Sequence, residues 1–237
     1  MGSPLNMKRI FEELLYSVLF IDSVRLRICK WRWIFLQKRL RFYHGSTTAG
    51  SIGQETVKHN LSAFEFDAVF GMARRMSLLL FPVAALLKDQ LNTARVLIVG
   101  PRTEDDIFWA WSLGLRNTEG MDLFSYSKYI AVGDIHNSEI ASDAYDAVLL
   151  GWMISYSSDP AKVIEECKRI LKPGGYLGIG IEANPLQRVE GIKPPRVNNL
   201  NSSKDLIELV QSPVVFTNEP YQDIRYDCAI VFKILPR

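Results

Sequence analysis

The chain has 237 residues, of which 48% are hydrophobic and 23% charged, and its formal net charge is +2. This composition indicates a globular protein with a sizeable core, and so small a net charge gives no reason by itself to expect a nucleic-acid partner. The three cysteines, Cys29, Cys167 and Cys228, lie far apart, with no CxxC pair and no Cys/His cluster. We therefore expect no zinc site, no other metal and no disulfide framework, but reduced thiols in a cytoplasmic protein.

No segment predicts a membrane span. The longest apolar run, residues 76–87, is too short to cross a bilayer and contains Pro82, so we expect a core helix there. Near the N-terminus, Glu12 and Glu13 interrupt what would be the apolar region of a signal peptide. Residues 1–6 resemble a vector-derived remnant and are left out of the fold prediction.

Residues 7–90 are predicted to form a helical N-terminal region. Helical patterns cover residues 10–19, 24–42 and 64–87. A Gly/Ser/Thr-rich passage, residues 45–53, separates the second pattern from the third and predicts a loop.

The basic aromatic segment, residues 24–43, is the most unusual part of this region. It interleaves seven Lys or Arg residues with five aromatic residues, and no acidic residue occurs from Ser23 to Gln54. Three interpretations stay open. The segment packs on its own domain or on a second copy, it contacts an anionic membrane surface, or it contacts nucleic acid, which is the least favoured of the three.

From Arg95 onward, short apolar runs alternate with helical ones. Strands are predicted at residues 95–100, 118–124, 129–134, 145–153, 176–182, 214–217 and 228–234, and helices at 104–113, 159–171 and 203–210. This alternation predicts an α/β fold with a doubly wound, mostly parallel seven-stranded sheet. The last two strands follow each other without a helix, so a terminal antiparallel hairpin is expected, in addition to the N-terminal helices.

Polar residues follow four of these strands. In an open parallel sheet, ligands bind beyond the carboxyl ends of the strands, where the strand order switches direction. Asp122 lies 22 residues after Gly100, a spacing that suits a carboxylate on a ribose. Asp134 and His136 follow the third strand, and Gly151 the fourth.

One stretch resembles the class I S-adenosylmethionine-dependent methyltransferases, and the likeness runs from about Arg95 to Glu182. It consists of Tyr145-Asp-Ala-Val-Leu-Leu, then Asp159-Pro, then Glu165-Glu-Cys-Lys-Arg-Ile-Leu-Lys-Pro-Gly-Gly175. The terminal strand pair is similar to the last hairpin of that family. The resemblance implies that residues 91–237 form a Rossmann-like methyltransferase domain with S-adenosylmethionine as its cofactor.

The resemblance also implies roles for individual residues. Gly100 and the turn after it, Pro101-Arg-Thr-Glu104, would lie beneath the methionine part of the cofactor. Asp122 would hold the ribose hydroxyls with Leu123 against the adenine, and Asp134 would accept from the adenine amino group with Ile135 beside it. Gly151 and Trp152 would line the other side.

The first motif departs from the family pattern. Ile98 stands where the family has an acidic residue, and Arg102 and Glu104 stand where it has further glycines. One interpretation is that Arg102 meets the cofactor's carboxylate while Glu104, Asp105 and Asp106 lie near its cationic groups. The other is that these acids only stabilise the start of a helix, with Thr103 and Asp106 as a capping box.

His136 is the titratable ring nearest the predicted site and is the candidate general base. The alternative is a loop histidine that is only solvated or hydrogen-bonded. Tyr126, Tyr129 and Tyr156 are candidates for an acceptor pocket or for the core. The leading hypothesis is methyl transfer to an oxygen or nitrogen of a small molecule or sugar. A catalytically silent binding or scaffolding protein is the alternative, and a nicotinamide-dependent oxidoreductase is the third possibility.

Overall fold

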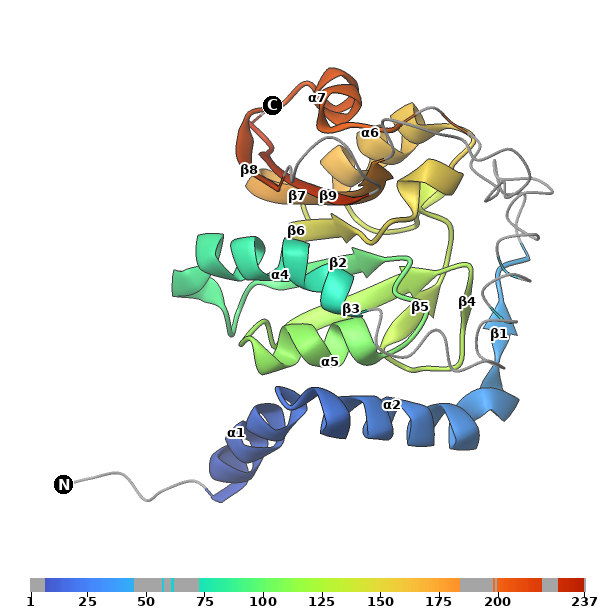
Figure 1. Ribbon diagram of the computed structural model, residues 1–237, viewed down its shortest axis with the longest axis vertical. Helices are drawn as coiled ribbons and strands as arrows, with labels where there is room; N and C mark the ends of the chain where they lie inside the picture. Colours follow the sequence, from blue (N-terminus) through green and yellow to red (C-terminus); the bar gives the residue numbers. More distant parts are fainter. Residues whose placement is uncertain are drawn as a thin grey trace.

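The computed structural model describes residues 7–44, 57, 61, 73–183, 198, 200–218 and 226–236. Two N-terminal helices lie along one side of an α/β domain, at the lower side of Figure 1. The strands of the central sheet are β2 (Arg95–Val99), β3 (Asn117–Asp122), β5 (Ile130–Val132), β6 (Tyr145–Leu150), β7 (Leu171–Ala183), β8 (Val214–Asn218) and β9 (Tyr226–Lys233).

The sheet has the strand order β5-β3-β2-β6-β7-β9-β8. The pairs among β5, β3, β2, β6 and β7 are parallel, whereas β9 runs antiparallel to both β7 and β8. The predicted seven-stranded, mostly parallel sheet with a terminal antiparallel pair is confirmed. Because β3 and β5 lie on one side of β2 and β6 on the other, the strand order reverses beside β2.

Helices cover both faces of the sheet. They are α1 (Met7–Leu19), α2 (Asp22–Leu36), α4 (Ala73–Leu86), α5 (Asp105–Ser112), α6 (Pro160–Ile170) and α7 (Ser203–Val210), with short 3-10 turns η1 (Gln37–Arg39), η2 (Lys88–Gln90), η3 (Ile135–Asn137) and η4 (Ile154–Tyr156). Among the described helices, none is both long and apolar enough to cross a membrane.

The central strand β2 shows how one sheet serves two cores. Val96 and Ile98 pack against α4 and α5, while Leu97 and Val99 pack on the opposite face against α6 and α7. A strand that is buried on both faces needs apolar residues at every position, and this strand reads Arg-Val-Leu-Ile-Val.

The predicted start of α6 is confirmed. The Oδ1 atom of Asp159 accepts a hydrogen bond of 3.0 Å from the backbone N–H of Lys162, and Pro160 occupies the first turn. A side-chain acceptor before the helix and a proline that needs no donor there together fix this end of the helix.

The N-terminal region differs from its prediction in one respect. The helix expected over residues 24–42 ends at Leu36, and Arg41–Phe42 form strand β1, which pairs antiparallel with β4 (Phe124–Ser125). Backbone pairing with a distant segment replaces the local helical preference here. Three predicted segments lie outside the described residues: the terminal residues 1–6, the loop at 45–53, and residues 64–72 of the helix predicted at 64–87.

Helix α2 is attached to α5 through buried ion pairs. Arg25 and Asp105 are each 2% exposed, and Nε of Arg25 donates to Oδ1 of Asp105 over 2.6 Å. About two helical turns further along α2, Arg32 donates from Nε and Nη2 to the two carboxylate oxygens of Glu104, which is fully buried. The guanidinium of Arg25 also lies 4.2 Å from the ring centroid of Trp109.

We predict that Arg25→Met lowers the free energy of unfolding by about 3–5 kcal/mol, because it leaves the carboxylate of Asp105 buried without its ionic partner. Urea denaturation followed by circular dichroism measures this. The matched control is Arg27→Met on the exposed face of the same helix, which should change stability by less than about 0.5 kcal/mol. Equal losses in the two variants would contradict a stabilising role for the buried pair.

Candidate functional site

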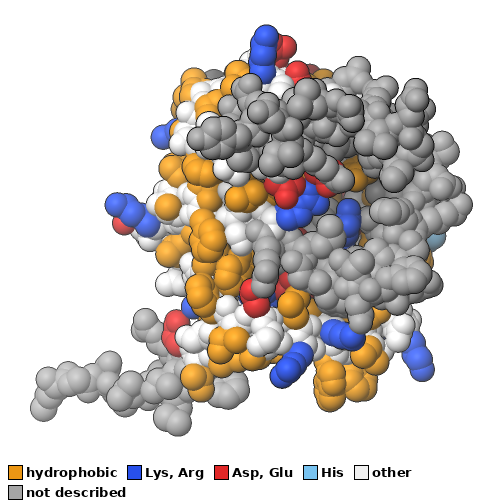
Figure 2. All heavy atoms as spheres, viewed as in Figure 1, with side chains coloured by type: hydrophobic (Ala, Val, Ile, Leu, Met, Phe, Trp, Pro, Cys, Tyr) orange, Lys and Arg blue, Asp and Glu red, His pale blue; other side chains and the backbone are white. Residues whose placement is uncertain are grey.

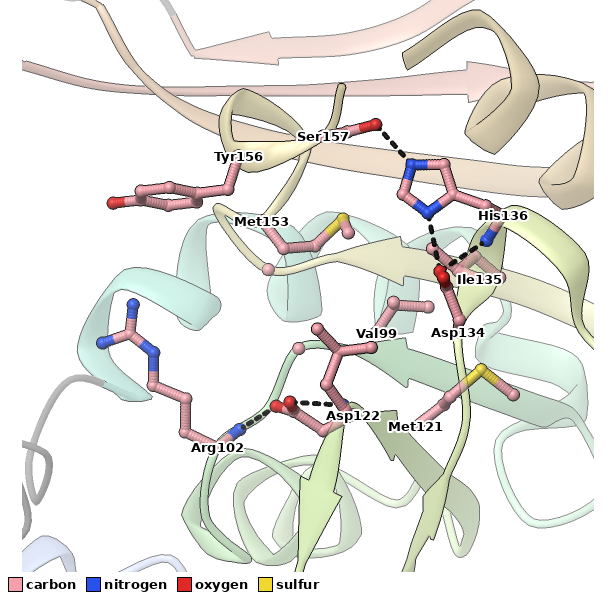
Figure 3. A pocket seen from close by; sticks show the side chains of 13 residues that line it. Val99, Arg102, Met121, Asp122, Asp134, Ile135, His136, Met153, Tyr156 and Ser157 are labelled. Atoms are coloured by element: carbon pink, nitrogen blue, oxygen red, sulfur yellow. Dashed lines mark hydrogen bonds and ion pairs between the residues drawn. The ribbon is translucent and has the colours of Figure 1, made fainter. Parts of the chain in front are cut away.

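A pocket opens at the carboxyl ends of β2, β3, β5 and β6, beside the reversal of strand order (Figure 3). The empty space of the pocket, its open mouth included, is about 660 Å³. It is lined by Val99, Gly100, Arg102, Met121, Asp122, Leu123, Asp134, Ile135, His136, Gly151, Met153, Tyr156 and Ser157.

The turn after β2 forms one wall. Gly100 has φ +76°, and a Cβ atom there would lie 3.0 Å from Cβ of Met153. Arg102 has φ +52°, a left-handed conformation that costs a side-chain-bearing residue about 1–2 kcal/mol. Its backbone N–H donates a hydrogen bond of 3.1 Å to Oδ2 of Asp122. The turn thus has a backbone conformation that favours glycine, although Arg102 occupies it. The hydrogen bond to Asp122 stabilises this conformation.

Asp122 ends β3 and is nearly buried, with 9% of its surface exposed. Its Oδ1 atom accepts a hydrogen bond of 2.7 Å from the backbone N–H of Leu123. Burial raises the pKa of this carboxyl to about 6, although the backbone N–H groups of Arg102 and Leu123 act in the opposite direction. A carboxylate has about four acceptor positions on its two oxygens, so Asp122 can still bind a hydroxyl.

Asp134, His136 and Ser157 form a buried chain on the other side of the pocket (Figure 3). The His136 ring lies with Nδ1 2.6 Å from Oδ1 of Asp134 and Nε2 2.6 Å from Oγ of Ser157. The backbone N–H of His136 donates to the same Oδ1 atom. Burial opposes ionisation of Asp134, but the hydrogen bonds from His136 prevail and lower its pKa. Oδ2 of Asp134 takes part in none of these three bonds.

The surface between the two carboxylates is apolar. Val99, Met121 and Met153 line it, and Ile135 and Leu123 continue it on either side. An apolar cavity with a few fixed acceptors at its rim suits a flat, partly polar molecule such as a nucleoside. Within the described residues, no group of three or more His, Cys, Asp or Glu side chains could hold a metal ion.

The structure brings most of the predicted site residues together. Those that line the pocket are Gly100, Arg102, Asp122, Leu123, Asp134, Ile135, His136 and Gly151. Tyr156 joins them, whereas Tyr126 packs edge to face with Trp33, and Tyr129 with Trp111, at the contact with the N-terminal helices.

The hypothesis that Glu104 and Asp105 lie near the cofactor's cationic groups is not supported by their positions. Neither lines the pocket, because both side chains turn toward α2 and bind Arg32 and Arg25. Ser127 donates a further hydrogen bond to Glu104. Of the polar residues in this turn, Arg102 is the one that faces the pocket.

Three other predicted residues also lie outside the described pocket lining. Pro101 packs against Gly120 of β3, and Oγ1 of Thr103 accepts from the backbone N–H of Asp105 over 3.2 Å. The Thr103–Asp106 capping box is thus replaced by a bond one residue earlier. Trp152 covers Gly180, and its Nε1 atom donates to Oδ1 of Asp227 over 3.0 Å.

Sequence reasoning missed the contributions of Val99, Met121, Met153 and Ser157. Val99 is the last residue of β2 and Met121 the penultimate residue of β3. The rule that ligands bind at strand ends could have found both. Ser157 carried no signal, because its contact with His136 joins residues 21 positions apart.

We predict that Asp122 makes stability depend on pH. Its raised pKa means that folding favours the neutral carboxyl, so this contribution is complete below about pH 4 and is lost as the pH rises through about 6. Wild type should therefore lose up to about 3 kcal/mol relative to Asp122→Asn between about pH 4 and pH 7. Urea unfolding of both proteins across this range measures it, and parallel pH curves would count against the raised pKa.

Comparisons with known proteins agree with this architecture. Residues 115–179 match a family model described as a methyltransferase domain. A stretch of 96 residues is 32% identical to methyltransferase ucsB of Acremonium sp, covering 40% of this chain, and the chain spans only 27% of that relative's length.

Among solved structures, the fold is similar to 1,6-didemethyltoxoflavin-N1-methyltransferase of Burkholderia thailandensis, with a TM-score of 0.55 at 12% identity. The match covers 83% of this chain and 95% of the other, which was solved with 1,6-didemethyltoxoflavin and S-adenosylhomocysteine bound. An identity this low speaks for the fold alone. Together with the strand order, it shows that the α/β domain has the Rossmann-like fold of class I methyltransferases, and residues 115–179 also match the methyltransferase-domain model.

Proposed function

We propose that this protein is an S-adenosylmethionine-dependent methyltransferase that acts on an oxygen or nitrogen of a small molecule or sugar. The observation that carries the proposal is the placement of Asp122 and Asp134 at the ends of adjacent strands in one apolar pocket. The family match and the ligands of the Burkholderia enzyme support the cofactor and a small-molecule acceptor.

The pocket residues suit the nucleoside part of the cofactor. Asp122 would accept hydrogen bonds from the ribose hydroxyls while its backbone partners hold it in place. Oδ2 of Asp134 would accept from the adenine amino group, since the bonds from His136 all end on Oδ1. Ile135 and Leu123 would contact the adenine ring.

The turn after β2 would hold the amino-acid end. The guanidinium of Arg102 can pair bidentately with the cofactor's carboxylate. Gly100 and Gly151 lie close to neighbouring side chains, because Cβ atoms at these positions would meet Met153 and Met76. When bound, S-adenosylmethionine supplies an electrophilic methyl group, and the protein's part is to position the acceptor in line with it and to exclude water.

His136 fits a positioning role better than the predicted role of general base. A base needs a free lone pair within reach of the acceptor, whereas both ring nitrogens already have partners at 2.6 Å. The ring instead fixes the orientation of Asp134 and supports its charge. We therefore assign His136 to the recognition of adenine.

Calorimetry with S-adenosylhomocysteine tests the cofactor site. We predict that Asp122→Ala weakens binding roughly 10- to 150-fold, the value of losing hydrogen bonds to a charged group. The exposed Asp89 provides the control, and Asp89→Ala should bind like wild type. Wild-type protein that binds neither S-adenosylhomocysteine nor S-adenosylmethionine at millimolar concentration would favour a catalytically silent scaffold instead.

Competition between adenosine and inosine tests Asp134 and His136. Inosine carries a carbonyl where adenosine carries the amino group, so a carboxylate acceptor should favour adenosine by about tenfold or more. Asp134→Asn should remove this preference, because an amide can also donate, and Ser157→Ala should reduce it by loosening His136. If the preference survives in Asp134→Asn, the adenine does not lie against this residue.

A further inference from the structure

Helix α2 presents large apolar side chains to solvent, although Cys29 and Trp33 of the same helix pack inward. Its side chains Arg25 and Arg32 point inward to Asp105 and Glu104. On its outer face, Trp31 is 67% exposed, Phe35 62% and Ile34 50%. A helix that only packs on its own domain exposes mainly polar side chains on its outer face. Exposed large apolar side chains grouped together mark an interaction surface.

The outer face is one continuous stripe. Arg27, Lys30, Trp31, Ile34 and Phe35 are all exposed, and their spacing of three and four residues places them on one side of the helix. The rings of Trp31 and Phe35 lie 4.7 Å apart, centroid to centroid. Figure 2 shows orange and blue side chains side by side along the lower edge of the molecule, over α2.

The charges around this stripe have one sign. Arg27 and Lys30 begin it, and the exposed Lys38, Arg39 and Arg41 follow directly after the helix. No acidic residue occurs in the sequence between Ser23 and Gln54. A surface of this composition attracts an anionic partner and offers it apolar contact at the same place.

We propose that the outer face of α2, residues 27–41, docks on an anionic lipid membrane surface. Cationic side chains stay among the headgroups while Trp31, Ile34 and Phe35 enter the boundary with the acyl chains, which is where tryptophan is favoured. A second copy of the chain fits less well, because a two-fold contact through this face would bring the two sets of cations together. The proposal does not depend on the methyltransferase activity.

Vesicle flotation with the whole protein tests the proposal. Wild type should float with vesicles of phosphatidylcholine and phosphatidylglycerol but not with pure phosphatidylcholine vesicles, and salt should weaken the binding. Trp31→Ala/Phe35→Ala should lower the partition coefficient roughly tenfold or more. Arg27→Gln/Lys38→Gln should lower it by roughly fivefold for each charge removed.

The matched control lies on α7, where Lys204 and Ile207 are also exposed. Lys204→Gln/Ile207→Ala should bind vesicles like wild type, and thermal unfolding should show that all variants remain folded. No binding of wild type to anionic vesicles would overturn the proposal. It would equally be overturned if the α2 variants instead abolished a dimer seen by sedimentation, or abolished binding to a short nucleic-acid duplex, without affecting vesicle binding.

Discussion

The pairing of Arg25 and Arg32 with Asp105 and Glu104 connects the features of this protein. It adds buried charges to the apolar packing of Cys29 and Phe108, and two carboxylates at the start of α5 neutralise two guanidiniums from α2. Burying any of these charges without its partner would cost free energy of folding. Helices α2 and α5 therefore stabilise each other in this position. While these arginines point inward, Trp31, Ile34 and Phe35 lie on the outer face of α2.

This pairing also explains why the first motif lacks glycines. Glu104 stands at a glycine position of the family pattern, and the structure uses its carboxylate to hold Arg32 rather than a ligand. Arg102 adopts a glycine-like backbone at the other position, where its N–H binds Asp122. A backbone conformation that favours glycine and the attachment of the N-terminal helices therefore share one short turn.

The two carboxylates of the pocket, Asp122 and Asp134, have different surroundings. Asp122 is buried among backbone donors and its pKa is raised, whereas Asp134 is hydrogen-bonded to His136 and its pKa is lowered. In the proposed cofactor site, Asp122 would accept from hydroxyls and Asp134 from an amino group, with the apolar wall against the adenine ring. His136 would then serve that site through Asp134.

The sequence by itself determined the alternation of strands and helices, the parallel sheet and the strand ends at Asp122 and Asp134, because these follow from local periodicity and from turn and cap residues such as Pro160. It could not determine the partners of Glu104 and Asp105, which lie 72 and 80 positions away in the chain. Nor could it reveal Ser157 behind His136 or the outward apolar face of α2. Those depend on which distant side chains meet on folding, and only the tertiary structure decides that.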